Sequence, residues 1–343
     1  MNQPEFSRRQ FFKCITLAGV ALSLGNIRSF ASKIGMPPDP APTDFEYQYR
    51  TFSVDHLHEV KKWFEELKRE HRLSDNKTFQ SYIGGFCIDK RAYLPSAKSF
   101  IIFSVPQHLL SITFNHEGGK YEIRIPTGYA PTGLTGAMLR ARIRKDIIMD
   151  PSKKIKGRVR LPLKTLSAHS GLAEYGRNNI SYVEKYGSYH ALYGLFTDKV
   201  LEDNWGPMKM HRMCRGCMVC RRECPTKCIP DSGFVINVGR CITLYNELPD
   251  SIPAWIKPNA HNTLVGCLKC QFGCPINEEV SKTINIIAEM TEEETEFILK
   301  QGKDKEYLKK IVEKLRAFPS AEELAYFSRN LSLVLANIKP MQS

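Results

Sequence analysis

The sequence predicts a mixed α/β fold, of the α/β or α+β kind, that continues into a cysteine-rich segment and a helical C-terminal segment. Helical and strand patterns intermix over residues 47–200, nine of the eleven cysteines lie between Cys214 and Cys274, and helical patterns return over residues 278–300 and 303–338. The chain has 343 residues, of which 42% are hydrophobic, so it has room for roughly two domains with real cores.

The first part of the chain shows both periodicities. A helix is expected from Val54 to His71, because apolar residues recur there at helical spacing. The apolar run from Lys98 to Pro106 predicts a buried strand. Residues 113–126 alternate weakly around two glycines and suggest a hairpin or a lid, and residues 133–149 predict a basic amphipathic helix.

The stretch from Leu163 to Asp198 is the densest in structural signals outside the cysteines. It predicts a helix to about Ala173, a glycine-punctuated turn, a strand over Ile180–Val183 and a second strand that ends at Thr197. Beyond the cysteines, Thr291 followed by three glutamates is a capping signal for a helix.

The first cysteine run has the spacing C-x2-C-x2-C-x3-C-P, at Cys214, Cys217, Cys220 and Cys224. This spacing is typical of two-cluster bacterial ferredoxins, in which three cysteines hold one 4Fe-4S cluster and the fourth ligates the other. Disulfides would be strained by such short spacers, and zinc more often uses two separated C-x2-C pairs. Two 4Fe-4S clusters are therefore expected.

The second run, over residues 267–274, is also followed by proline but is one cysteine short of a full copy. In the crossed pattern of a ferredoxin, Cys274 completes the cluster held by the first three cysteines of the chain's first run. Cys224 then joins the other two cysteines of the second run. Either Cys241 or Cys228 can supply the ligand that is still missing.

Residues 1–31 are expected to be a twin-arginine signal peptide. Residues 7–13 read S-R-R-Q-F-F-K, an uncharged stretch follows to Ile27, and cleavage is expected after Ala31. The expected location is therefore periplasmic or extracytoplasmic, by way of the twin-arginine export machinery, or cytoplasmic if the leader is not functional. Residues 32–46 are rich in proline and predict a linker.

The formal net charge of +13 suits acidic partners, such as nucleic acid, anionic lipid, a phosphate-bearing cofactor or an acidic electron donor. The densest basic run, over residues 153–160, is interpreted as a solvated loop. No nucleic acid is expected as a partner of an exported protein.

Four stretches resemble the corrinoid iron–sulfur reductases, the group that contains epoxyqueuosine reductase and the reductive dehalogenases. They are Y-L-P-S-A-K-S-F-I-I from Tyr93, S-G-L-A-E-Y-G-R-N-N from Ser170 with the later G-S-Y and F-T-D, the cysteine region with R-C-I-T from Arg240, and S-R-N-L-S-L-V-L-A-N from Ser328. On this likeness Cys241 is preferred to Cys228 as the eighth cluster ligand. The ligand sets are then Cys214, Cys217, Cys220 and Cys274 for cluster 1, and Cys224, Cys241, Cys267 and Cys270 for cluster 2.

The resemblance implies a nitroreductase-like α/β cofactor domain over residues 47–205, a ferredoxin-like domain with two 4Fe-4S clusters over residues 206–280, and a helical segment over residues 281–343. In this family the clusters pass single electrons to a base-off cobalamin that attacks an epoxide carbon or a carbon–halogen bond. A flavin is the alternative cofactor. The candidate cofactor-binding residues are those of the glycine segment, namely Gly171, Leu172, Gly176, Asn178, Gly187 and Ser188.

The chain departs from epoxyqueuosine reductases at the proton donor. Those enzymes have an aspartate shortly before the glycine segment, whereas residues 151–173 contain no acid. The resemblance to reductive dehalogenases instead implies a tyrosine as the proton donor, with a basic residue beside it. Tyr129, Tyr175 and Tyr182 are therefore the candidates, and spacing does not choose between them.

The leading prediction is an exported 4Fe-4S oxidoreductase that resembles reductive dehalogenases. It would take electrons from a donor, for which a membrane-associated protein is one candidate, and reduce a small organic substrate. One alternative is a 4Fe-4S electron-transfer protein without turnover, which would explain the missing aspartate. The other is an epoxyqueuosine reductase-like tRNA-modifying enzyme, which suits the basic charge, because phosphates dominate affinity for RNA.

Overall fold

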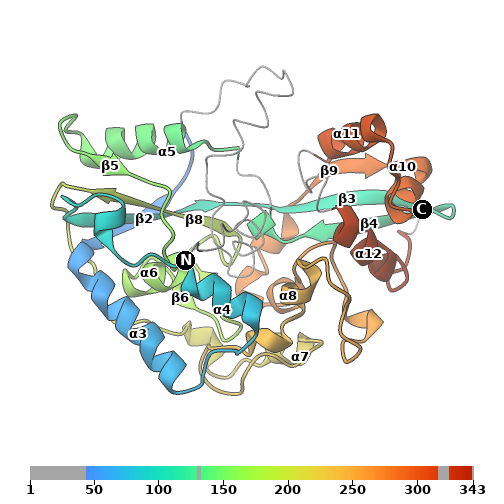
Figure 1. The fold of residues 1–343 in the computed structure, drawn as a ribbon, viewed down its shortest axis with the longest axis horizontal. Coiled ribbons are helices and arrows are strands. Elements are labelled where there is room, and N and C mark those ends of the chain that lie inside the picture. The colour runs from blue at the N-terminus through green and yellow to red at the C-terminus, as the bar shows by residue number, and fades with distance from the viewer. Residues whose placement is uncertain (1–43, 130–132, 316–323, 342–343) are drawn as a thin grey trace, which may run out of the picture.

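The computed structural model describes residues 44–129, 133–315 and 324–341 of the chain. The predicted signal peptide of residues 1–31 lies outside these residues, as does most of the predicted linker. The mixed α/β class is confirmed, because helices pack on both sides of a central sheet (Figure 1). No helix among the residues described has the length and apolar character needed to cross a membrane.

The central sheet is antiparallel throughout. β2 (Ser99–Pro106) and β8 (His190–Thr197) form its middle, β1 (Gln48–Ser53) pairs with the free side of β2, and β5 (Ile155–Lys156) pairs with β8. All but the last residue of β2 are buried. A continuous apolar run predicts this, since a strand with both faces covered carries no polar alternation.

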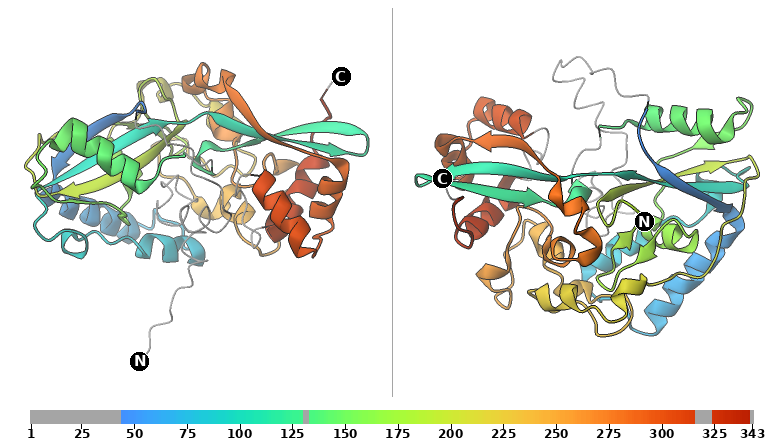
Figure 2. Two further views of the ribbon diagram at one scale, coloured as in Figure 1. Left: turned by 90° about the horizontal axis from the view of Figure 1, so that it is seen from above. Right: turned by 180° about the vertical axis from the view of Figure 1, so that it is seen from behind.

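Helices cover the two faces of this sheet. α3 (Leu57–Arg69) and α6 (Leu163–His169) pack on one face together with Phe100 and Phe196, and α4 (Lys77–Gly84) lies on the same side. α5 (Gly136–Ile143) covers the opposite face of the sheet, where it packs against Ile101 of β2. Figure 2 shows the sheet between these two layers from other directions.

A second core joins distant parts of the sequence. The predicted hairpin is present as β3 (Leu109–His116) and β4 (Gly119–Ile125), and β9 (Ile284–Met290) lies parallel to β3. Three helices, α10 (Glu292–Leu299), α11 (Lys305–Lys314) and α12 (Leu324–Leu335), pack against this sheet. The hairpin is thus part of a core, which excludes the interpretation as a lid.

The prediction of a helix over residues 278–300 is wrong for the first half of this range, where the chain forms β9. The three isoleucines of this strand are β-branched residues that suit a pleated surface, and the edge of β3 offers them backbone partners. The capping signal is confirmed, since Thr291 and Glu294 form a capping box at the start of α10.

The cysteine region consists mostly of loops, with the short helices α7 (Val219–Glu223), α8 (Ile242–Asn246) and α9 (Lys269–Phe272). It lies below the hairpin in Figure 1 and beside the helices of the first core. Asn330 of α12 donates from Nδ2 to the carbonyl oxygens of Asn246 and Leu264, at 2.9 and 2.7 Å. The C-terminal helices therefore hold the loops that carry the cysteines.

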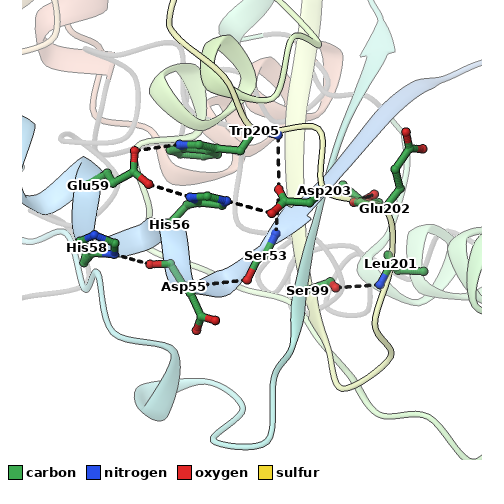
Figure 3. Close-up of polar contacts among 11 residues, drawn as sticks. Ser53, Asp55, His56, His58, Glu59, Ser99, Leu201, Glu202, Asp203 and Trp205 are labelled. Atoms are coloured by element: carbon green, nitrogen blue, oxygen red, sulfur yellow. Dashed lines mark hydrogen bonds and ion pairs between the residues drawn. The ribbon is translucent and has the colours of Figure 1, made fainter.

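The segment that leads from β8 into the cysteine region is anchored to the start of α3 (Figure 3). His56 contacts Glu59 Oε1 at 2.6 Å and Asp203 Oδ2 at 2.9 Å. Trp205 donates from Nε1 to Glu59 Oε2 at 3.0 Å, and its ring stacks on those of His56 and His169, with centroids 4.8 and 4.3 Å away. These contacts set the direction in which the chain approaches the first cysteine run.

Candidate cofactor and cluster sites

The glycine segment brings side chains of the α/β part against the cysteine loops. Gly171, just after α6, has a φ of +72°, a left-handed conformation that glycine adopts without steric cost. At Gly176 an added Cβ would lie 2.4 Å from the ring of Tyr182 and 2.5 Å from Oδ1 of Asn178. This close approach of the backbone allows Asn178 and Tyr182 to reach the cysteine region. Two short strands, β6 (Glu174–Tyr175) and β7 (Ser181–Tyr182), pair across the turn.

Four cysteines face a small cavity, and they are the four predicted for cluster 1: Cys214, Cys217, Cys220 and Cys274. All are buried except Cys217, which is partly exposed. Burial, followed by repulsion from the three neighbouring thiols, raises the pKa of the Cys220 thiol to about 11. Thiolates are therefore unfavourable in this cavity unless a metal centre compensates for their charge.

Hydrogen bonds join the glycine segment to both cysteine runs. The Tyr182 hydroxyl donates to Cys274 Sγ at 3.3 Å. Asn178 donates from Nδ2 to the Tyr182 hydroxyl oxygen at 2.9 Å and to the Cys270 carbonyl oxygen at 3.0 Å. The buried Arg177 guanidinium donates from Nη2 to the Cys214 carbonyl oxygen at 2.7 Å. The segment predicted to bind a cofactor thus also supports the cluster loops.

A large cavity of about 210 Å³ lies on the other side of Asn178, which lines both cavities. α3 and α4 contribute aromatic and apolar side chains to it, and the start of α6 contributes Lys164 and Thr165. Its opposite wall contains five cysteines: Cys224, Cys228, Cys241, Cys267 and Cys270. The four cysteines predicted for cluster 2 are therefore together, with Cys228 as a fifth.

Cys228 lies beside both Cys224 and Cys241, of which it could replace Cys241 as a ligand. Its Sγ lies 3.5 Å from that of Cys224, and its backbone amide donates to Cys224 Sγ at 3.4 Å. The Cys228 thiol, which can donate its hydrogen to one of the two sulfurs at a time, is the main cause that lowers the pKa of Cys224 to about 5 and that of Cys241 to about 7. The preference for Cys241 over Cys228 as the ligand stays a prediction.

Among the residues described, no three His, Cys, Asp or Glu side chains converge closely enough to hold a single metal ion. A four-iron cluster needs one thiolate at each corner and thus a wider spacing. The buried and half-buried thiols around each cavity, together with donors directed at their sulfur atoms, fit such a cluster. Asn262, for example, donates from Nδ2 to Cys267 Sγ at 3.2 Å.

Lys164 is a half-buried cation in the wall of the large cavity, and the sequence pattern predicted no role for it. Its Nζ donates to the backbone oxygen of Asn179 at 2.9 Å and to Oδ1 of the same residue at 3.0 Å. Burial lowers the pKa of Lys164 to about 8, against the attraction of Cys241 and Cys270. The only signal in the sequence was a lysine within the apolar stretch L-P-L-K-T-L.

The three tyrosines proposed as proton donors occupy different sites. Tyr129 and Tyr175 line the large cavity, whereas Tyr182 lines the small one. The Tyr129 hydroxyl donates to the Glu247 carboxylate, and the Tyr175 hydroxyl lies 3.1 Å from Thr165 Oγ1. Burial raises the pKa of Tyr175 to about 12.

Of the six residues predicted to bind the cofactor, Asn178 lines the large cavity. Ser188 instead contacts the loop after Cys274: its amide donates to Asn277 Oδ1 at 2.9 Å, and Asn277 Nδ2 donates to its hydroxyl at 2.8 Å. At Gly187, with a φ of +56°, an added Cβ would lie 2.4 Å from the same Oδ1. Direct cofactor binding by the glycine segment stays a prediction.

No family model matches the chain. Similar curated proteins are epoxyqueuosine reductases: that of Pseudomonas aeruginosa is 32% identical over 115 residues, which are 33% of this chain and 31% of the relative. That of Bacillus subtilis is 27% identical over 115 residues, 34% of this chain and 29% of the relative. The match to the Bacillus cereus protein is longer, with 26% identity over 234 residues, 63% of this chain and 58% of the relative. The chain thus spans about a third of the length of the first two relatives.

Solved structures show the same fold. Epoxyqueuosine reductase from Streptococcus thermophilus superposes with a TM-score of 0.57 at 18% identity, covering 91% of this chain and 80% of that one. Epoxyqueuosine reductase solved with an epoxyqueuosine-modified tRNA-Tyr stem loop gives 0.56 at 16% identity, with the same coverage. The expected corrinoid iron–sulfur reductase fold is therefore found, and the likeness is to its epoxyqueuosine reductase branch.

Two expectations are corrected by these comparisons. The prediction that no nucleic acid is a partner is wrong, because an enzyme with this fold has been solved with a tRNA stem loop. The prediction of an extracytoplasmic location is also contradicted, since the similar proteins are epoxyqueuosine reductases and tRNA modification takes place in the cytoplasm. Both errors came from giving residues 7–13 more weight than the likeness of the remaining chain.

Proposed function

We propose that the chain is a two-cluster 4Fe-4S reductase of the epoxyqueuosine reductase type, which reduces a modified nucleoside in RNA. The observation that carries this proposal is the separation of the cysteines into two groups. Five of them form a wall of the large cavity, four face the small cavity, and Asn178 borders both. Such an arrangement suits a path for single electrons from cluster 1 to cluster 2 and on to a cofactor in the large cavity.

The lining of the large cavity suits contact with part of a cobalamin bound without an axial histidine, since a volume of about 210 Å³ is less than a whole corrinoid occupies. Among its described lining residues there is no histidine, and the aromatic side chains of α3 and α4, such as Trp63 and Phe79, offer flat apolar surfaces. The polar groups that remain near the cysteines include Lys164, Thr165 and Asn178. When bound, a corrinoid supplies a strongly nucleophilic metal centre and the clusters supply its electrons. A flavin is the alternative occupant.

Lys164 is the group best placed to supply a proton. Reduction of an epoxide to an alkene takes two electrons and two protons and releases one water. The aspartate that serves epoxyqueuosine reductases is missing from residues 151–173, but the Lys164 ammonium lies in the cavity wall at the start of α6. Its lowered pKa of about 8 makes it a better proton donor near neutral pH than an ordinary lysine.

The experiment is a single-turnover assay without oxygen. The full chain is reconstituted with iron, sulfide and cobalamin, reduced chemically, and mixed with a tRNA stem loop that contains epoxyqueuosine. Mass spectrometry of the nucleosides is expected to show the loss of one oxygen atom. If an authentic epoxyqueuosine reductase converts the same stem loop and the fully loaded chain does not, the proposal is wrong.

A second candidate is the reduction of a small organic substrate on the same scaffold. One observation favours it: the described residues that line the large cavity include no aspartate or glutamate, whereas Tyr129, Tyr175 and Lys164 are present. A tyrosine proton donor with a basic neighbour is what the resemblance to reductive dehalogenases implies. Release of halide from a halogenated phenol by the loaded chain, with no change in the stem loop, would select this candidate.

A further inference from the structure

The segment that carries three of the cluster 1 cysteines has a strong positive charge, whereas the segment after Cys274 carries two exposed acids, Glu278 and Glu279. Residues 209–227 contain six lysines and arginines and one acid, Glu223, which gives 6 − 1 = +5. Lys209, Arg212, Arg215, Arg222 and Lys227 are exposed. Of the six, only Arg221 forms an ion pair within the described structure, with Asp231 at 2.8 Å. The charge of this surface is therefore largely available to a partner.

The same surface has an apolar centre beside the cluster ligands. Met213, next to Cys214, is 49% exposed and lines the small cavity. Cys217, which is the partly exposed ligand of the four, lines it too. An apolar centre with a charged rim is the usual composition of a protein interface. We call the exposed residues Lys209, Arg212, Met213, Arg215, Arg222 and Lys227 the basic face.

The expected direction of electron flow suggests a role for the basic face in electron entry. The cysteines predicted for cluster 2 line the large cavity, so on the proposed function this cluster delivers electrons to a bound cofactor. Cluster 1 then has to receive them, and its partly exposed cysteine, Cys217, is in the basic segment. The expected electron entrance and the basic residues are therefore in the same part of the chain.

We propose that the basic face is the docking site of a small acidic protein that carries one electron at low potential, of the ferredoxin or flavodoxin class. The inference rests on the proposed function, since it takes cluster 1 as the point of entry. In each encounter the donor loses one electron and cluster 1 gains one, and two encounters supply the pair that the reduction needs. Opposite charges raise the rate of encounter and orient the partners, while the contact around Met213 brings the two redox centres close.

The test measures electron entry directly rather than turnover. The full chain with both clusters is mixed without oxygen with a reduced plant-type ferredoxin, an acidic protein whose potential is about −400 mV, and the bleaching of the clusters is followed by stopped flow. The variant Arg212→Glu/Arg215→Glu/Arg222→Glu is expected to slow this reaction about tenfold or more at low salt. The wild-type rate should fall steeply with salt, and that of the variant should not.

A matched control reverses the same number of charges elsewhere. Lys305, Lys309 and Lys310 are exposed on α11, far from α7 in Figure 1, and their change to glutamate should leave the rate within about twofold. Reduced methyl viologen, a cation, should reduce the Arg212→Glu/Arg215→Glu/Arg222→Glu variant at least as fast as wild type. This result shows that cluster 1 is intact in the variant.

Two results would overturn the proposal. The first is an unchanged ferredoxin rate in the arginine variant, and the second is an equal loss in the α11 variant. An unchanged rate together with lost binding of a tRNA stem loop would make the basic face an RNA-binding surface instead. A chain that takes up no iron would overturn the proposed function as well, whereas loaded clusters that leave epoxyqueuosine unchanged would affect the proposed function alone.

Discussion

The two groups of cysteines have similar spacing in the sequence but different surroundings in the fold. The cluster 1 group faces a small cavity, has one partly exposed member, and lies beside unpaired arginines at the surface. The cluster 2 group forms a wall of the large cavity, has five members rather than four, and lies near the half-buried Lys164. On the proposed function, the first site receives electrons and the second delivers them.

This difference shows how the fold gives a symmetric motif a direction. The helices α3, α4 and α6 contribute to the large cavity that the cluster 2 cysteines line, and Asn178 lines both cavities. On the proposed function, the second cluster therefore serves the cofactor.

The largest expected effect separates the two candidates for the last ligand of cluster 2. Cys241→Ser should lower the iron content from about eight to about four atoms per chain and abolish turnover, because a 4Fe-4S cluster needs four thiolates. Cys228→Ser should keep about eight, since Cys228 is the fifth thiol of the group. Iron analysis and electron paramagnetic resonance of the reduced protein measure both.

Cys274→Ser is the matched change in cluster 1, and it should remove the other cluster. The assignment of ligands fails if Cys228→Ser loses four irons while Cys241→Ser loses none. In that case Cys228 is the ligand of cluster 2, and Cys241 is the fifth thiol that binds no iron.

The second prediction concerns the proton at Lys164. Lys164→Met should lower turnover by a factor of about 10² to 10⁴, the usual contribution of a general acid, with both clusters retained. Wild-type turnover should be present below pH 8 and fall as the pH rises through about 8, because the ammonium loses its proton there. The turnover of the variant should not show this decrease as the pH rises through about 8.

Lys269→Met provides the control, because Lys269 also lines the large cavity but is exposed. Its change should alter neither the rate nor the pH profile appreciably. An unchanged pH profile in Lys164→Met would show that another group supplies the proton, and Tyr129 and Tyr175 would then be tested.

The third prediction is a shift in potential at cluster 1. The Tyr182 hydroxyl donates to Cys274 Sγ, and such a bond stabilises the more negative, reduced state. Tyr182→Phe should lower the midpoint potential of cluster 1 by about 40 mV, equivalent to about 1 kcal/mol for one electron. Potentiometric titration measures it, and Tyr175→Phe, an equally buried tyrosine without a sulfur contact, should shift neither cluster. A shift of cluster 2 rather than cluster 1 would reverse the assignment of Cys274.

The smallest expected effect is at cluster 2. Asn262 shares its Nδ2 donor between Cys267 Sγ at 3.2 Å and the Ala260 carbonyl oxygen at 3.0 Å, so less of it is available to the sulfur. Asn262→Leu should lower the midpoint potential of cluster 2 by about 20 mV and leave cluster 1 unchanged. Equal shifts of both clusters would show that the two sites are not electrostatically separate.

Most of the local structure could be predicted from the sequence. The buried strand over Ser99–Pro106, the hairpin around two glycines, and the start of α10 at Thr291 all follow from apolar runs, turn residues and caps. β9 could not be predicted, because its pattern is ambiguous and its strand state depends on hydrogen bonds to β3, more than 160 residues earlier. Tertiary contacts of this kind override local propensity.

The candidate site divides in the same way. The cysteine spacing predicted two groups of thiols, and the structure brings the predicted members of each group together. Spacing did not reveal that Cys228 joins the second group, that Tyr182 contacts a cysteine rather than the large cavity, or that the half-buried Lys164 lines that cavity. Each of these facts depends on which loops meet in space.

The sequence by itself determined the fold class, the likeness to corrinoid iron–sulfur reductases and the grouping of the cysteines, because periodicity and short motifs depend on neighbours along the chain. Only the tertiary structure decided which group of cysteines lines the large cavity and which lines the small one. Burial and the pKa of a group depend on segments that are remote in sequence, such as α6 and the loops around Cys241 and Cys270. On the proposed function, the direction of the electron path is therefore a property of the packing and not of the cysteine motif.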